Sequence, residues 1–327
     1  MKNVVQLHAD VDDSVWVSFD KFRRAYNRIH LNDGAKNLVE FKKGMIAFLK
    51  TSFSYSYKLL FKNDEVVGSI ELLLFNKGEA EEVLNVRIYV LKEKIIQDFE
   101  EELKLEIAQW KKLAKKIKLE VSYKNLMQLL EEQGYENGND SIWFQLKTEN
   151  INNTIVKEFL NKDIIEKNKL TFELNQELKE HEFSDVANLM TILLNDIKRV
   201  DRHQTFKETP ENIKEIVDNH KNSNSNLFHL LLRNEKEELV GMSIIVFKKE
   251  NPNSVNQFMT GVLKEYRGLG LPTWMKAYMY DYLQQNYSTV KLIKTDCFAE
   301  NTPMIHINKK MGFKEVIRTT EMIYENK

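Results

Sequence analysis

The fold of this chain is decided by the stretch Val262–Pro272, which reads VLKEYRGLGLP. Residues 255–263 are rich in β-branched and apolar side chains, so they predict a buried strand. Beyond the stretch, apolar side chains recur at the spacing of one helix face: Leu271, Trp274, Met275, Tyr278, Met279, Tyr282 and Leu283. The sequence therefore predicts a strand, a short Arg-Gly loop and a helix.

The loop between this strand and helix has the chemistry of an anion site. Gly268 and Gly270 allow a tight turn and a close approach of a ligand to the backbone. The first turn of a helix has unpaired N–H groups and a partial positive charge, to which Arg267 adds a full charge. We interpret the loop as a phosphate-binding turn. The alternative is that the two glycines only mark a change from strand to helix.

Two common phosphate motifs do not fit this loop. A P-loop has Lys followed by Ser or Thr after its last glycine, whereas Leu271 and Pro272 follow here. A dinucleotide-binding fingerprint needs a third spaced glycine and an acidic residue about 20 positions further on, and this loop offers only its pair of glycines.

The residues after the long helix indicate which protein family the chain resembles. Residues 290–296 predict a second strand, Asn301 the start of a short amphipathic helix, and Gly312 its end. This order resembles the GNAT superfamily of acetyl-CoA-dependent N-acyltransferases over Leu174–Tyr324, and most closely over Asn256–Phe313.

The first half of the chain repeats this plan. A strand, turn and strand at residues 57–74 recur at 228–247, and Gly68 lies 173 positions before Gly241. A strand, a long helix, a second strand and a short helix follow at residues 84–91, 95–114, 117–121 and 125–132, closed by Gly134. A period this long indicates duplicated domains rather than a solenoid.

We therefore predict an α/β (α+β) chain of two GNAT-like domains, each with a mixed, mostly antiparallel central sheet flanked by helices. The predicted ranges are 1–150 for a degenerate domain, 151–169 for a helical linker and 170–327 for the catalytic domain. In the catalytic domain, a strand at 170–174 precedes helices that begin at the N-caps Ser184 and Thr209. This tandem plan is similar to that of mycothiol synthase-like proteins.

The two copies differ at the loop. After Leu91 the first half reads Lys92-Glu93-Lys94, with no glycine. Side chains at every position block a close approach to the backbone, and the Glu93 carboxylate repels an anion. We predict that the first domain binds no CoA and has a structural or acceptor-shaping role.

The resemblance implies direct transfer of an acetyl group from acetyl-CoA to an amine. The strand ending at Leu263 parts from the next strand, and the pantetheine arm enters the gap. A backbone amide near Met259–Gly261 polarises the thioester carbonyl. The resemblance places these residues against acetyl-CoA: Val262, Leu263, Arg267, Gly268, Leu269, Gly270, Leu271, Pro272, Asn301 and Asn308. The loop 198–208, with Arg199, Asp201, Arg202 and His203, either helps to form the acceptor pocket or is an ordinary solvated loop.

The sequence offers several candidates for the general base and none for the general acid. Asn308 stands where many family members have a tyrosine that protonates the leaving thiolate, and asparagine cannot act as an acid. Pro272 also departs from the motif and removes one N–H donor. The candidates for the general base, by position near the cleft, are Asp296, Glu300, His306 and Glu321. Cys297 lacks an identifiable base partner, so a buried apolar role is favoured over that of a nucleophile.

The composition of the chain bears on its cellular compartment and on the kinds of partner it can bind. Apolar residues make up 42% and charged residues 30% of the chain, and the net charge of −1 gives no support for a nucleic-acid-binding surface. The single cysteine indicates a reducing compartment. The N-terminus lacks the apolar core of a signal peptide, and no apolar run approaches a membrane span of about 18 residues. We expect a cytoplasmic monomer or homodimer without membrane, nucleic-acid or metal partners.

These observations predict an N-acyltransferase (EC 2.3.1.-). Its acyl donor is acetyl-CoA, and its acceptor is an amine-bearing small molecule whose identity the sequence does not specify. The alternative is a non-catalytic acyl-CoA-binding or interaction module.

Overall fold

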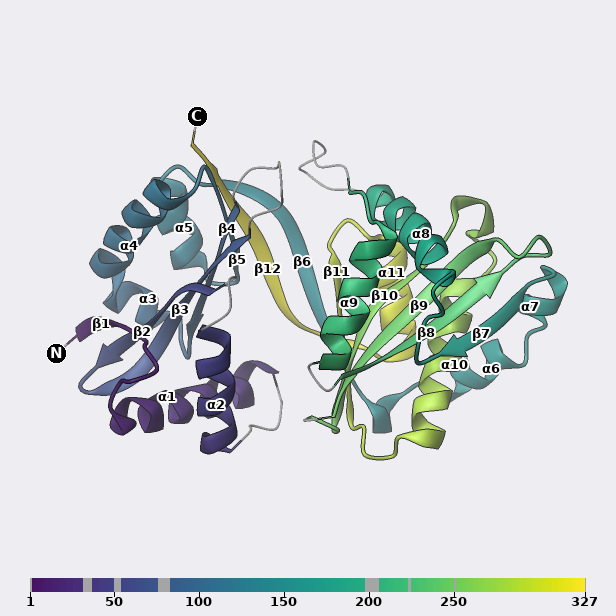
Figure 1. Ribbon diagram of the computed structural model, residues 1–327, viewed down its shortest axis with the longest axis horizontal. Helices are drawn as coiled ribbons and strands as arrows, with labels where there is room; N and C mark the ends of the chain where they lie inside the picture. The colour runs from purple at the N-terminus through teal and green to yellow at the C-terminus, as the bar shows by residue number, and fades with distance from the viewer. Residues whose placement is uncertain are drawn as a thin grey trace. The chain divides into compact units, whose positions relative to one another are not determined.

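The computed structural model describes residues 2–31, 37–49, 54–75, 83–197, 206–222, 225–249 and 251–326 (Figure 1). The chain forms two compact units. The first comprises residues 1–140 and 319–327, and the second comprises residues 141–318. In each unit, hydrophobic clusters lie on both faces of a sheet, between the strands and the helices that cover them.

In the first unit the strands lie in the order β1-β2-β3-β4-β5-β12. Their bounds are Lys2–Gln6, Ser54–Lys62, Glu65–Phe75, Val83–Val90, Lys116–Val121 and Lys314–Glu325. Neighbours are antiparallel except β4 and β5, which are parallel. One face is covered by α1 (Asp13–Tyr26), which runs into the π-helix η1 (Asn27–Leu31), and by α2 (Leu38–Leu49). The other face is covered by α3 (Lys94–Asp98), α4 (Glu100–Leu113) and α5 (Lys124–Glu132).

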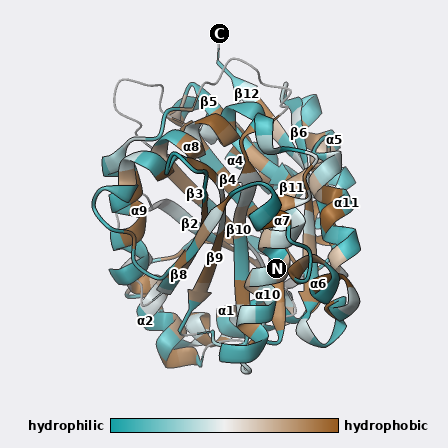
Figure 2. Ribbon diagram, turned by 90° about the vertical axis from the view of Figure 1, so that its right-hand side faces the viewer, coloured by the Kyte–Doolittle hydropathy of each residue, from teal (hydrophilic) through white to brown (hydrophobic). Residues whose placement is uncertain are grey.

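The second unit has the same plan, with strands in the order β6-β11-β10-β9-β8-β7. Their bounds are Glu136–Lys147, Leu292–Phe298, Ser254–Val262, Leu239–Lys248, Ser225–Arg233 and Thr171–Asn175. Only β10 and β11 are parallel. Strand β9 is buried along almost its whole length and appears brown in Figure 2. Helices α8 (Glu182–Asp196) and α9 (Pro210–Asn222) cover one face. Helices α6 (Asn153–Leu160), α7 (Ile164–Lys167), α10 (Leu271–Asn286) and α11 (Thr302–Met311) cover the other.

The predicted fold class is confirmed: each unit has a mixed, mostly antiparallel sheet flanked by helices. The two halves exchange their last strands. Strand β6, at the end of the first half, pairs with β11 in the second unit, whereas β12, at the end of the chain, pairs with β5 in the first unit. The predicted domain ranges follow the chain order, which cannot reveal such an exchange. Their functional division into a degenerate and a catalytic domain remains a prediction.

Three local predictions differ from the structure. The helix expected at 95–114 is interrupted at Phe99, whose fully buried ring and non-helical backbone (φ −113°, ψ 20°) separate α3 from α4. The predicted helical linker at 151–169 contains two short helices, α6 and α7. Ser184 is not an N-cap, because the Glu182 carboxylate accepts a hydrogen bond from the backbone N–H of Lys179 at 2.6 Å and α8 begins earlier.

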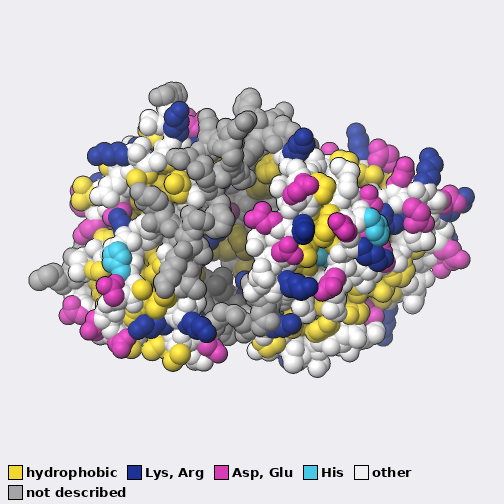
Figure 3. Space-filling view, in the orientation of Figure 1, with side chains coloured by type: hydrophobic (Ala, Val, Ile, Leu, Met, Phe, Trp, Pro, Cys, Tyr) yellow, Lys and Arg dark blue, Asp and Glu magenta, His cyan; other side chains and the backbone are white. Residues whose placement is uncertain are grey.

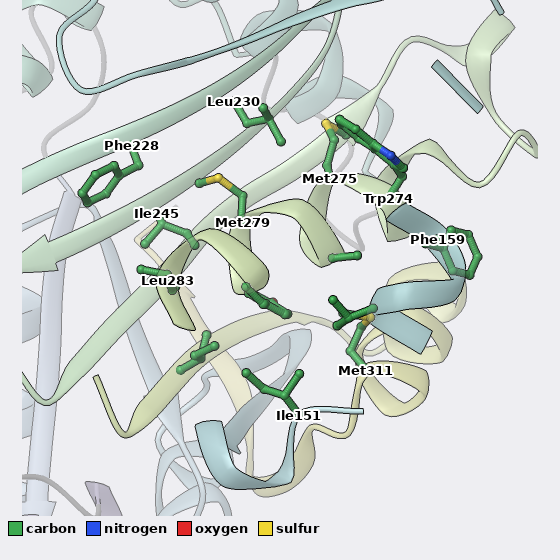
Figure 4. Packing of buried hydrophobic residues seen from close by; sticks show 14 of the residues in the cluster. Ile151, Phe159, Phe228, Leu230, Ile245, Trp274, Met275, Met279, Leu283 and Met311 are labelled. Atoms are coloured by element: carbon green, nitrogen blue, oxygen red, sulfur yellow. The ribbon is translucent and has the colours of Figure 1, made fainter. Parts of the chain in front are cut away.

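Helix α10 is buried on more than its predicted apolar face. Its side chains Met275, Met279 and Leu283 point toward the sheet residues Leu230 and Ile245 (Figure 4). Helix α6 packs against α10 as well. The segment expected to be a linker is therefore part of the core that holds the predicted anion-binding turn.

Candidate functional site

The two central strands of the second unit part from each other. Strands β10 and β11 pair over three positions, from Ser254 opposite Leu292 to Asn256 opposite Lys294. One position further on, the Thr295 hydroxyl still donates to the Gln257 carbonyl oxygen at 3.0 Å. Beyond it both strands continue, to Val262 and Phe298, with no further backbone pairing between them in the described residues. The predicted gap between the strands is therefore confirmed.

A β-bulge lies where the gap opens. The pairing of β10 with β9 shifts between Gln257 and Met259, so Phe258 is an extra residue, and it is 57% exposed. The buried side-chain amide of Gln257 donates to the carbonyl oxygens of Ile244 (3.0 Å) and Met259 (3.2 Å) and to the Ser243 hydroxyl (3.0 Å). A bulge bends its strand, so Gln257 stabilises the geometry that opens the gap. Its sequence context did not indicate this role.

The turn after β10 leaves backbone donors without acceptors. Gly268 and Gly270 have φ values of 79° and 81°, in the left-handed region that glycine adopts without strain. A Cβ added to Gly268 would meet open space. In the part of the chain that the structure describes, no protein acceptor is present for the N–H groups of Gly268, Leu269, Gly270, Leu271 and Thr273. These donors lie at the positive end of α10, as an anion site requires.

Arg267 is paired in this structure. Its guanidinium forms an ion pair with the carboxylate of Asp196, the last residue of α8. Both side chains are partly exposed, at 47% and 40%, so solvent screens their attraction and the pair contributes little to stability. A diphosphate at the turn would compete with Asp196 for the guanidinium.

The backbone edge of β10 that faces the gap is set by its pairing with β9. The Leu263 N–H donates to the Val240 carbonyl oxygen at 2.8 Å, so Leu263 is committed to β9. In an antiparallel pair, successive residues direct their N–H and C=O groups to alternate edges. Val262 therefore presents its backbone groups to the gap, where an extended ligand can pair with them.

The two candidate asparagines have different surroundings. Asn301 caps α11, since its side-chain oxygen accepts from the Met304 N–H at 3.3 Å, as predicted. Asn308 is fully buried, and neither its side-chain nitrogen nor its oxygen has a partner in the described residues. An unpaired buried amide costs about 1–3 kcal/mol. The surroundings of Asn308 therefore leave its side-chain hydrogen-bonding groups unsatisfied.

Asp296 lies on β11 within the parted segment. Strand alternation directs its side chain to the opposite face from Thr295 and Cys297. The residue has solvent access, yet its carboxyl is close enough to protein atoms that desolvation raises its pKa. Its cross-strand neighbour is Trp143, whose indole N–H is buried without a partner in the described residues. Cross-strand neighbours share a face, so a carboxyl and an aromatic side chain lie together there.

The structure does not bring the other base candidates together with Asp296. Glu300 follows β11 and His306 is on α11, and both are exposed. Glu321 belongs to β12 in the first unit, where Lys118 and Asn139 each approach its carboxylate at 3.1 Å. The loop residues Arg199, Asp201, Arg202 and His203 lie outside the described residues.

Two further titratable side chains, Cys297 of β11 and Lys276 of α10, are shielded from solvent. Burial raises the pKa of the Cys297 thiol to about 11, which disfavours the thiolate that a nucleophile needs. Lys276 of α10 is almost completely buried and interacts electrostatically with that thiol. The sequence pattern predicts no role for Lys276, although a lysine among the apolar residues of this helix is a detectable signal.

In the first unit, side chains form hydrogen bonds at the end of β4 and at the turn that follows it. Strands β4 and β5 also pair over a short stretch, from Val83 to Val86, and then part. The Tyr123 hydroxyl donates to the Val90 carbonyl oxygen at 2.9 Å, at the end of β4. The Glu93 carboxylate accepts from the Asn125 N–H at 2.9 Å. The turn thus carries a carboxylate where the second unit has open glycine backbone.

The parted parallel strands and the glycine turn at a helix start are the arrangement that the GNAT resemblance implies. Residues 192–313 match the model of the acetyltransferase (GNAT) family, and the chain carries a GNAT acetyltransferase domain. A comparison with curated proteins finds no match.

Several solved structures share the fold of the whole chain. A tandem GNAT protein from the clavulanic acid biosynthesis pathway, solved without acetyl-CoA, is 15% identical with a TM-score of 0.69, over 100% of this chain and 99% of its own. A GCN5-related N-acetyltransferase from Sphaerobacter thermophilus is 11% identical with a TM-score of 0.63, over 100% and 96%. At these identities the likeness concerns the fold, and it supports the tandem plan.

The surface adds little to the assignment of a partner. On the face shown in Figure 3, basic and acidic side chains are interspersed among the described residues. No helix in the described ranges combines the length and apolar character needed to cross a membrane. Nor do three His, Cys, Asp or Glu side chains cluster as metal ligands in that part of the chain.

Proposed function

We propose that the second unit transfers an acetyl group from acetyl-CoA to a primary amine by direct attack in a ternary complex. The observation that carries this proposal is the gap between β10 and β11, next to a helix start with unpaired N–H groups. The diphosphate would accept from the N–H groups of residues 268–273, Pro272 excepted. The pantetheine arm would pair with the open edge of β10 at Val262.

Asp296 is the base that the geometry favours. It lies in the parted segment of β11, and desolvation raises its pKa toward the range in which a carboxylate accepts a proton efficiently. The attacking amine would approach from the face of Asp296 and Trp143. Glu300, His306 and Glu321 have no comparable support, and Asn301 is already used as a helix cap.

The first unit is proposed to bind no CoA. The Tyr123 hydroxyl bonded to Val90 and the Glu93 carboxylate at the turn both oppose an entering anionic ligand. This unit would serve a structural or acceptor-shaping role.

The test is to incubate the purified chain with acetyl-CoA and a panel of primary amines. The panel should include simple amines, amino-acid derivatives and aminoglycosides, with thiol release and the mass of the product as readouts. We expect an acetylated amine and one equivalent of free CoA. Binding of acetyl-CoA without turnover across the panel would instead favour a non-catalytic acyl-CoA-binding module. Absence of binding would refute the assignment of the site.

A further inference from the structure

Phe258 exposes an aromatic ring at the place where the two central strands part. It is the extra residue of the β-bulge, and it is 57% exposed. Single exposed apolar side chains are common on protein surfaces. Phe258 differs from them by its position, two residues beyond Asn256, the last residue of β10 that pairs with β11. In the described chain its ring stacks on no other aromatic ring.

The pairing with β9 fixes the face of the sheet from which Phe258 projects. Gln257 is opposite Ile245, which belongs to the hydrophobic cluster that includes α10. The residue that follows Gln257 points to the other side of the sheet. Met259 is opposite Ile244, which belongs to the cluster that includes α8 and α9. Two residues of a bulge oppose one residue of the partner strand, so Phe258 projects from the α8 face together with Met259.

The carboxyl of Asp296 projects from the same face. Asn256 is opposite Val246 of the α8 cluster, and Lys294 is opposite Asn256. Directly opposite residues share a face, as do residues two apart in one strand. Asp296 follows Lys294 by two positions, just as Phe258 follows Asn256. The two side chains therefore stand at the same level of the parted strands and on the same side.

Trp143 completes this level of the sheet. It lies opposite Asp296, on the side of β11 away from β10. Its indole N–H is buried without a partner in the described residues, so its side chain offers a ligand only carbon surface. Two strands that flank a third lie about 10 Å apart where all three pair, and the parting of β10 widens this distance. A flat ring or a short alkyl chain can enter such a space between two aromatic side chains.

The neighbouring rows of the same face limit the apolar surface. The preceding row is polar and consists of Asn256, Lys294 and Gln145. In the other direction α8 lies directly on β10, since a Cβ added to Gly261 would come within 2.8 Å of the Leu193 side chain. The surface open to a ligand is therefore a single row, with a carboxyl between two aromatic side chains.

The first unit lacks this bulge. Strand β4 pairs with β3 without a shift of register, from Val83 opposite Phe75 to Val90 opposite Gly68. Two positions beyond its last pairing with β5, β4 has Ile88, which packs against the core. The fold of the unit does not itself require a bulge or an exposed ring at this place. Of the two pairs of strands, the one beside the open turn carries both.

We propose that Phe258 and Trp143 bind the carbon skeleton of the acceptor, and that the acceptor is a primary amine on an aromatic or apolar group. The proposal rests on the proposed acetyl transfer, in which Asp296 accepts the proton of the attacking nitrogen. Aromatic side chains bind apolar and aromatic groups by surface burial and ring contacts. They offer no hydrogen bonds to hydroxyl groups, so a polyhydroxylated amine would lose its hydration there without compensation.

The experiment compares two groups of acceptor at saturating acetyl-CoA. We expect kcat/KM to be at least about tenfold higher for 2-phenylethylamine and tryptamine than for glucosamine and kanamycin. Phe258→Ala should lower kcat/KM for 2-phenylethylamine about tenfold, chiefly by raising KM. For ethylamine, which has no ring to contact Phe258, kcat/KM should stay within about twofold of wild type. The Kd for acetyl-CoA should be unchanged by calorimetry.

Phe172→Ala is the matched control. Phe172 is also an exposed phenylalanine of the second unit, but its ring lies 5.0 Å from that of Trp274 of α10, on the opposite face. This variant should keep the wild-type preference for 2-phenylethylamine over glucosamine. Trp143→Leu is a second variant on the proposed surface, and it should raise KM for 2-phenylethylamine as Phe258→Ala does.

Two results would overturn the proposal while acetyl transfer itself stands. One is an equal or higher kcat/KM for the hydroxylated amines, and the other is a Phe258→Ala variant that retains the wild-type kcat/KM for 2-phenylethylamine. If the wild-type chain binds acetyl-CoA but acetylates no amine, the proposed function fails first, and the proposed acceptor class fails with it.

Discussion

At the scale of single residues, the anion-binding turn uses backbone donors more than side-chain charge. Arg267 is the cation next to the two glycines of the predicted motif, and its guanidinium is bound to Asp196. The N–H groups at Gly268 to Leu271 have no such competitor in the described chain. Acetyl-CoA should therefore bind chiefly through main-chain amides, with Arg267 contributing only after it exchanges partners.

Asp196→Asn tests this exchange. Removing the carboxylate leaves Arg267 available to a diphosphate, so we expect acetyl-CoA to bind a few-fold more tightly, as suits an exposed ion pair worth up to about 1 kcal/mol. Arg267→Glu should weaken binding at least tenfold. Calorimetry at two salt concentrations checks both. Weaker binding by Asp196→Asn would show that the ion pair orders the turn rather than occupying it.

Asp296→Asn tests the base. The amide keeps the shape of the side chain but cannot accept a proton from the amine. We expect kcat to fall about 100-fold, with the acidic limb of the pH profile lost and the Kd for acetyl-CoA retained. Glu300→Gln, at an exposed neighbouring carboxylate, is the matched control. Equal losses in both variants would argue against Asp296 as the specific base.

Lys276 also gives stability a pH dependence. Its pKa is about 7 in the folded state against 10.5 when exposed, so between these pH values the unfolded state binds more protons. The free energy of unfolding should therefore rise with pH from 7 to about 10, by several kcal/mol at about 1.4 kcal/mol per pKa unit. Urea unfolding of Lys276→Met should lack this rise and exceed wild-type stability at pH 7. Parallel curves for the two proteins would rule the effect out.

At the scale of elements, the strand β10, its bulge and the start of α10 act together. Gln257 holds the bulge, the bulge accompanies the parting of β10 and β11, and Gly268 and Gly270 turn the chain into the helix. Both glycines have a left-handed backbone, which disfavours other residues. The space around a side chain at the two positions differs. A Cβ at Gly270 would lie 3.1 Å from the Phe159 ring, whereas a Cβ at Gly268 would lie in open space.

Gly268→Ala separates folding from binding. The left-handed backbone makes alanine unfavourable by about 1 kcal/mol, and no steric clash adds to this. The new methyl group would lie on the open side of the turn, so we expect the affinity for acetyl-CoA to fall at least tenfold. Thermal unfolding and calorimetry together test this expectation. Unchanged affinity would place the diphosphate elsewhere.

At the scale of the whole molecule, two copies of one plan have diverged at the same turn. The first unit keeps the parting of β4 and β5, yet it has Tyr123 and Glu93 where the second has open backbone. The last strands are exchanged between the halves, so each unit depends on chain from the other half. Separate expression of residues 1–150 and 170–327 would remove a strand from each sheet.

The divergence predicts one molecule of acetyl-CoA per chain. Isothermal titration should give a stoichiometry near one in the wild type, and none in a variant that carries Gly268→Ala and Arg267→Glu together. Replacement of Glu93 by glutamine should leave the stoichiometry unchanged, because Tyr123 still bonds to Val90. Two sites per chain would contradict the degenerate role of the first unit.

Local pattern in the sequence determined the secondary elements around the turn, the helix cap at Asn301, the duplication and the GNAT resemblance. These follow from periodicity and turn chemistry, which act over a few residues and leave a readable trace. Only the tertiary structure decided that Asp196 pairs with Arg267, that Glu321 belongs to the first unit and that Lys276 is buried in α10. Such facts depend on contacts between residues far apart in the chain. The local sequence around one residue does not indicate which distant residue it contacts.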